Sequence, residues 1–224
     1  MHVTRHSPTA VTAHRQTTSV HDSRKTMSGS DVDALVEKYG MQAHPEGGFF
    51  VETYRSGETT GDLPTPLFPG GEDVRRSFST CILFLIPEGE RSSLHRIASD
   101  EVWHFYAGDP IAIEVLDEEK QGGNGHSRLL LGNPLVHGDR CSFQHVVPAG
   151  LWFGARLEHD PLLLDQDPTH PSTPKEARKG YALVGCTVSP GFDFADFELA
   201  KASDLKTLFP HPDLSTLIDV MAQP

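Results

Sequence analysis

The chain has 224 residues, which suits one domain with a single sizeable core. Its formal net charge of -12 and the lack of a long Lys and Arg cluster argue against a nucleic acid partner. No apolar run approaches the roughly 20 residues that cross a bilayer, so no membrane partner is expected. With 20 Gly and 17 Pro, the composition is typical of a loop-rich β protein and not of a helical bundle.

The three cysteines, Cys81, Cys141 and Cys186, lie far apart and form no CxxC pair. An odd number at this spacing indicates reduced, buried thiols and excludes a cysteine zinc site. We therefore expect an intracellular, cytoplasmic protein.

The segment 1–30 is rich in Ser, Thr, His and Arg, has no acidic residue before Asp22, and offers almost nothing to bury. We expect a disordered tail there and a single domain over 31–224. An organelle transit peptide has the same composition. A protein whose true start is Met27 would explain the segment equally well.

The first predicted element is a helix that ends at Gly40. Ser30 and Asp33 resemble a capping box, and one helical face carries the apolar residues Val32, Leu35, Val36 and Tyr39. We expect this helix to plug or flank the rest of the domain.

Segments rich in β-branched and aromatic residues then recur between turn signals, and eight such strands predict a sandwich or barrel. They are 49–54, 79–86, 101–106, 111–116, 127–131, 143–147, 152–157 and 181–188. Gly122 to Gly125 predicts a hairpin turn, and 57–73 and 159–179 look irregular. Short helices are expected after residue 200, with the packing residues Leu205, Leu208, Leu214, Leu217 and Ile218.

Five blocks carry a family resemblance: 44–48 (HPEGG), 52–55 (ETYR), 95–108 with EVWHFY inside it, 147–152 (VPAGLW) and 184–192 (VGCTVSPGF). Over residues 33–200 the chain resembles the cupin superfamily, in its branch of unknown function related to sugar-nucleotide epimerases. The resemblance implies an all-β jelly-roll barrel, the cupin double-stranded β-helix, with a cavity between its sheets and frequent homodimers.

The resemblance also implies a metal set of three histidines and one glutamate, and this chain departs from it. His95 and Glu101 occupy two of the positions, whereas Ile97 and Phe153 replace the other histidines. We therefore expect no cofactor, with a divalent metal held by His95 and Glu101 as an alternative. His104 and His145 are conceivable substitutes, although strand alternation turns His104 away from Glu101.

A pocket should then contain His95 and Glu101 within apolar walls. Alternation places Trp103 and Phe105 on the face of Glu101, and Phe153 on the face of Leu151, opposite Trp152. Apolar walls raise the pKa of a carboxyl unless a histidine pairs with it. Epimerase-type cupins imply His95 as the base, with Glu101 orienting it or moving the proton. The competing interpretation makes all of these residues structural.

Arg55 is a further candidate ligand-binding residue, together with Glu52 of the same block. The pattern Phe49, Val51, Thr53, Arg55 predicts a shared face that brings the guanidinium to the pocket mouth. There it would bind a carboxylate or phosphate, or else form a surface salt bridge. For His44 and Glu46, which precede this strand, we favour capping and turn hydrogen bonds.

The function predicted from the sequence is binding of a small polar or sugar-like ligand, with metal-independent isomerisation or epimerisation through His95 and Glu101. Two alternatives remain open at this point. One is a metabolite-binding module without turnover, and the other is a metal-dependent oxygenase or lyase with an unusual ligand set. The expected partners are the small ligand and a second copy of the chain.

Overall fold

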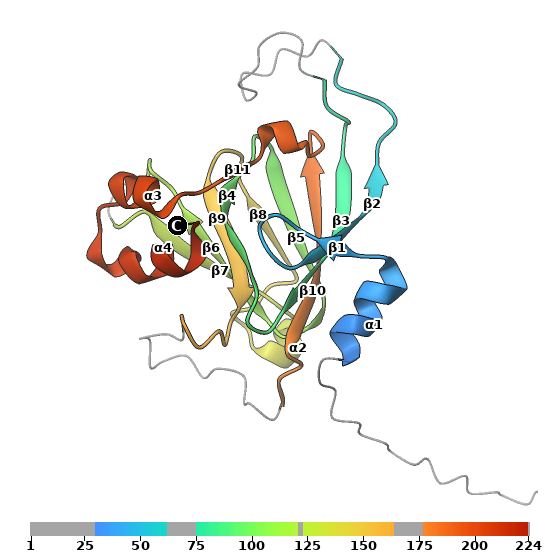
Figure 1. Ribbon diagram of the computed structural model, residues 1–224, viewed down its shortest axis with the longest axis horizontal. Helices are drawn as coiled ribbons and strands as arrows, with labels where there is room; N and C mark the ends of the chain where they lie inside the picture. The colour runs from blue at the N-terminus through green and yellow to red at the C-terminus, as the bar shows by residue number, and fades with distance from the viewer. Residues whose placement is uncertain (1–29, 62–74, 121–122, 164–176, 224) are drawn as a thin grey trace, which may run out of the picture.

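The fold consists of two antiparallel sheets that face each other, as Figure 1 shows. The computed structural model describes residues 30–61, 75–120, 123–163 and 177–223. One sheet has the order β1-β2-β3-β10-β5-β8 and the other β11-β4-β9-β6-β7, without closing into a continuous barrel. The predicted all-β jelly roll with short terminal helices is confirmed.

The strands of the first sheet are β1 (Gln42–Ala43), β2 (Phe49–Arg55), β3 (Thr80–Pro87), β5 (Asp100–Gly108), β8 (Gln144–Val147) and β10 (Tyr181–Ser189). Those of the second are β4 (Arg91–Arg96), β6 (Ile111–Leu116), β7 (His126–Leu131), β9 (Trp152–Leu157) and β11 (Glu198–Leu199). The helices are α1 (Ser30–Tyr39), α2 (Pro134–His137), α3 (Ala202–Leu208) and α4 (Ser215–Met221), with 3-10 turns η2 (Phe194–Asp196) and η3 (Pro212–Leu214).

The main core fills the space between the two sheets. Ile111, Ile113 and Val115 of β6 point into it, as period-two alternation requires. Phe153 joins the same core, whereas Trp152 lies in a second core on the back of its sheet. The predicted opposition of these two aromatic residues is therefore confirmed.

Helix α1 flanks the first sheet. Val32, Leu35 and Val36 pack against Leu85 and Leu183 on the outer side of β3 and β10. Tyr39 was expected on this face as well, but its ring is exposed because the helix ends there and the chain turns at Gly40.

The second core lies between the second sheet and the carboxyl-terminal helices α3 and α4, drawn in red in Figure 1. Leu205, Leu214, Leu217 and Ile218 are buried there, as predicted. Leu208 was expected to pack too, but it is 45% exposed because it ends α3 on the solvent side.

The eight predicted strands are all present, with bounds that differ by two residues at most. Strand β4 and the two-residue strands β1 and β11 were missed. In β4 the residues are RSSLHR, whose polar composition resembles a loop, although β9 and β11 pair with it on both sides. This omission matters because β4 carries His95.

Some of the other predictions concern residues that lie outside the described ranges. That holds for the tail over 1–29 and for most of the two irregular segments. The predicted hairpin joins β6 and β7, and Gly125 adopts a φ of 77°. The three cysteines are free, and Cys81 is only half-buried. No helix in the described part of the chain is long and apolar enough to cross a membrane.

Candidate functional site

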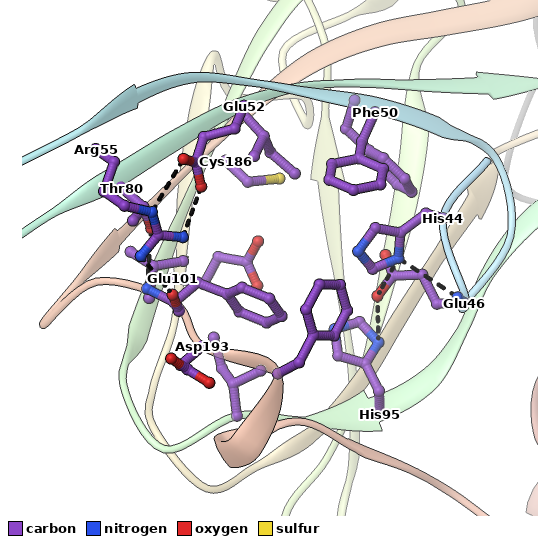
Figure 2. A pocket seen from close by; sticks show the side chains of 16 residues that line it. His44, Glu46, Phe50, Glu52, Arg55, Thr80, His95, Glu101, Cys186 and Asp193 are labelled. Atoms are coloured by element: carbon purple, nitrogen blue, oxygen red, sulfur yellow. Dashed lines mark hydrogen bonds and ion pairs between the residues drawn. The ribbon is translucent and has the colours of Figure 1, made fainter. Parts of the chain in front are cut away.

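A cavity of about 210 Å³ lies between the sheets and brings most of the candidate polar residues together (Figure 2). Strands β2, β3, β4, β5 and β10 contribute to its wall, and the segments 44–46 and 192–194 complete it. The polar lining residues are His44, Glu46, Glu52, Arg55, Thr80, His95, Glu101, Cys186 and Asp193.

His95 reaches the cavity from β4. Its neighbour Leu94 points the other way into the second core, so alternation fixes the imidazole on the inner side. Its Nδ1 lies 2.8 Å from the carbonyl oxygen of Ser93, and a carbonyl only accepts, so Nδ1 carries the hydrogen. Burial lowers the pKa of His95 against the opposing charge of Glu101. The ring is therefore neutral near pH 7, with its lone pair on Nε2.

Glu101 comes from β5 and is 7% exposed. Burial raises the pKa of Glu101 to about 7, although His95 and the thiol of Cys186 favour its charged form. Figure 2 shows its carboxyl group directed into the cavity. At neutral pH this group can thus hold or release a proton.

His44 and Glu46 also line the cavity, which corrects the expectation that they serve mainly in a turn. Glu46 Oε2 lies 3.4 Å from His95 Nδ1 and 3.5 Å from His44 Nδ1. Burial raises the pKa of Glu46 to about 7 and lowers that of His44. The signal in the sequence was the placement of two ionisable residues immediately before paired glycines.

The glycines explain how this segment reaches the site. The Ser93 N–H donates to the Glu46 carbonyl, which fastens the segment to β4. Gly47 has a φ of 111°, and a Cβ at this position would lie 2.2 Å from the carbonyl oxygen of Arg91. Only a glycine allows this approach, and the approach places His44 and Glu46 beside His95.

Arg55 and Glu52 both line the cavity, but not through the predicted face. The pairing of β2 with β3 slips between Glu52 and Tyr54, so Thr53 is an extra residue and Arg55 joins the side of Phe50 and Glu52. Phe49 and Val51 pack toward α1 instead.

The Arg55 guanidinium forms a bidentate ion pair with Glu52, with Nε–Oε1 and Nη2–Oε2 distances of 2.9 and 2.6 Å. Its Nη1 donates to the Phe192 carbonyl oxygen at 3.1 Å. Of the two alternatives left open by the sequence, the structure forms the salt bridge.

The aromatic candidates lie behind the cavity rather than in its wall. Trp103 and Phe153 belong to the main core, and the Phe153 ring centroid lies 4.2 Å from that of His95. Phe105 packs at the edge of this core and contacts His137. The rings that do line the cavity were not predicted, and they are Phe50, Phe84, Phe192 and Phe194.

The residues present do not fit the metal set that the family implies. Ile97 lines the cavity and Phe153 backs His95, and neither side chain can ligate an ion. His104 binds Thr187 and Gln144, and His145 binds the Leu130 carbonyl, so neither joins His95. Among the described residues no group of three His, Cys, Asp or Glu side chains is arranged to hold a metal.

Comparisons with known proteins agree with this architecture. Residues 33–200 match the family model described as cupin superfamily (DUF985). A hypothetical protein from Leishmania major is 30% identical, with a TM-score of 0.66 over 86% of this chain and 98% of that one. A protein of Shewanella oneidensis is also 30% identical, with a TM-score of 0.62 over 86% and 97% of the two chains.

A search of curated proteins gave no match. The family model covers the sheets and every block that lines the cavity, from His44 to Phe194. On this evidence the chain belongs to the cupin superfamily, in the family described as DUF985.

Proposed function

We propose that the protein binds a small polar carbonyl compound in this cavity and moves a proton on the carbon beside the carbonyl, as an isomerase or epimerase does. The observation that carries the proposal is the pairing, in one enclosed cavity, of a neutral imidazole with a carboxyl group whose pKa is about 7. A neutral imidazole that can accept a proton and a carboxyl group that can donate one near neutral pH are the groups that this reaction requires.

In the proposed step, His95 Nε2 takes the proton from carbon, and the electron pair of the broken C–H bond forms the C=C bond of an enol. Protonated Glu101 gives its proton to the carbonyl oxygen at the same time. Return of a proton to the other face of the same carbon, while the enol O–H gives its proton back to Glu101, completes epimerisation. Return of the proton to the former carbonyl carbon, while the hydroxyl on the neighbouring carbon gives its proton to Glu101, completes isomerisation. The backbone carbonyl of Ser93 holds the Nδ1 hydrogen of His95, so Nε2 is the nitrogen that accepts and returns the proton.

Solvent exchange tests this proposal directly. The protein is incubated in deuterated water with a panel of sugars and keto compounds, and deuterium at carbon is followed by NMR. We expect incorporation into at least one compound, with a loss of about 100-fold or more in His95→Gln and Glu101→Gln.

His104→Gln is the matched control, because His104 lies on the outer face of the sheet and binds Thr187 and Gln144 there. Its exchange rate should equal that of the unchanged protein. Binding of a compound without any deuterium uptake across the panel would instead make the cavity a metabolite-binding site without turnover.

A further inference from the structure

The cavity contains many acceptors of hydrogen bonds and few free donors. Four carboxyl groups line it, from Glu46, Glu52, Glu101 and Asp193, against the single guanidinium of Arg55. All three nitrogens of that guanidinium already donate to Glu52 and the Phe192 carbonyl. A phosphate or carboxylate on a ligand would therefore meet repulsion and few free N–H groups.

Another buried acid, outside the cavity, is surrounded by basic side chains and differs from the cavity acids in its pKa. Glu114 lies in β6 outside the cavity and accepts from Arg156, Arg128 and His126 at 2.9, 3.0 and 2.7 Å. Burial alone would raise its pKa, but these partners hold the pKa at about 2.

Glu101 has no such partner. It is as enclosed as the other cavity acid, Glu46, and within the described parts of the chain no Lys or Arg nitrogen forms an ion pair with either carboxyl. Two nine-tenths buried acids thus face the cavity beside neutral groups, the imidazoles of His44 and His95 and the thiol of Cys186. A ligand that supplies a positive charge would compensate the acid that ionises.

The apolar part of the wall fits the same kind of group. The rings of Phe50, Phe84, Phe192 and Phe194 line the cavity, and Phe192 and Phe194 lie edge to face with centroids 5.0 Å apart. The negative face of an aromatic ring attracts an ammonium group, and several rings around buried carboxylates are an arrangement that binds organic cations.

We propose that the ligand recognised in this cavity carries an ammonium group, as a small organic amine or an amino sugar does, and carries no phosphate or carboxylate. This inference rests on the proposed function in taking the cavity as the ligand site. It adds that the charge of the ligand faces ionised Glu46, with the Phe rings around it, while Glu101 keeps the proton that the proposed step uses.

Three probes of nearly one shape test the charge preference. Choline is the cation, 3,3-dimethyl-1-butanol its neutral counterpart, and 3,3-dimethylbutanoate an anion of the same branched skeleton. Binding is measured by NMR titration of the full chain at about pH 8.5, where carboxyls of pKa about 7 are ionised. We expect choline to bind at least about tenfold more tightly than the alcohol, and we expect the anion to bind most weakly of the three.

Substitutions identify the residues that cause the charge preference. Glu101→Gln and Glu46→Gln should each reduce the preference for choline over the alcohol by severalfold, and either one serves if the other does not fold. Glu52→Gln frees the Arg55 fork and should raise the affinity for the anion. Glu37→Gln, on the exposed side of α1, is the control and should change none of the three affinities.

Equal affinities for choline and the alcohol, tighter binding of the anion, or no binding of choline would overturn this inference. The exchange experiment separates the two proposals. Deuterium uptake into a neutral or anionic compound without a preference for choline leaves the proposed function standing, whereas choline preference without any uptake removes only the catalytic step.

Discussion

At the scale of single residues, the chain keeps two acids in the cavity that weaken its stability at neutral pH. Glu101 binds its proton more tightly in the folded chain, with a pKa of about 7 against 4.5 in the unfolded chain. The cost to stability is therefore absent below pH 4.5, grows as the pH rises toward 7, and is complete above it. Under the proposed function, this cost follows from the role of Glu101 as a proton donor.

Replacement of Glu101 by Gln should thus stabilise the protein above pH 7. The gain has an upper bound of about 3–4 kcal/mol, from roughly 1.4 kcal/mol per pKa unit. Urea unfolding of both proteins between pH 4.5 and 8 measures the difference. The difference in unfolding free energy should be near zero at pH 4.5 and rise to a plateau above pH 7. A pH-independent difference would refute this account of Glu101.

The residue scale also shows what the sequence could predict about the site. His95 and Glu101 were found because a family spacing marks them. Glu46 was assigned to a turn because its role depends on contact with β4, which is distant in sequence. Trp103 and Phe153 were placed on the correct inward side by alternation, yet alternation does not tell which inward residues border empty space.

At the scale of secondary structure elements, the segment 44–48 positions two ionisable groups of the cavity, His44 and Glu46. Gly47 permits its contact with β4, where a Cβ would clash with the Arg91 carbonyl. Gly47→Ala should destabilise the protein by about 1–3 kcal/mol and slow deuterium exchange severalfold, because displaced Glu46 no longer contacts the proposed base His95.

The matched control is Gly57→Ala. Gly57 has no atom within 4 Å of its added Cβ and no positive φ, so thermal unfolding and exchange should stay close to those of the original chain. A Gly47→Ala protein with normal exchange would show that the contact of this segment with His95 is not needed for the reaction.

At the same scale, the sequence predicted eight strands well because β-branched and aromatic residues follow period-two alternation in them. It missed β4 because RSSLHR has only one strongly apolar residue, and pairing with β9 and β11 stabilises the strand instead. The bulge in β2 could not be predicted for a related reason, because pairing with β3 decides which residue of β2 is the extra one.

At the scale of the whole molecule, two cores share the second sheet. The inner side of β4 carries His95 toward the cavity, and its outer side carries Leu94 against the carboxyl-terminal helices. Ile218 of α4 is fully buried in that outer core. Packing of α4 therefore supports the strand that holds the proposed base.

Ile218→Ala should cost about 2–5 kcal/mol of unfolding free energy, because it leaves a void in the outer core. Leu208→Ala removes a similar side chain from an exposed position at the end of α3 and should change stability by less than about 0.5 kcal/mol. Denaturant unfolding of the two variants compares them. Equal losses would mean that the helices pack differently from this arrangement.

The extra residue in β2 makes the charge at the cavity mouth a matter of strand register. A chain lacking Thr53 would pair with β3 without a bulge and would still keep Arg55 on the side of Glu52, whereas regular pairing that included Thr53 would turn Arg55 to the outer surface while Glu52 stayed in place. A relative whose second strand pairs without this bulge at unchanged length would therefore present an unneutralised acid at its entrance, without any substitution among the residues that line it.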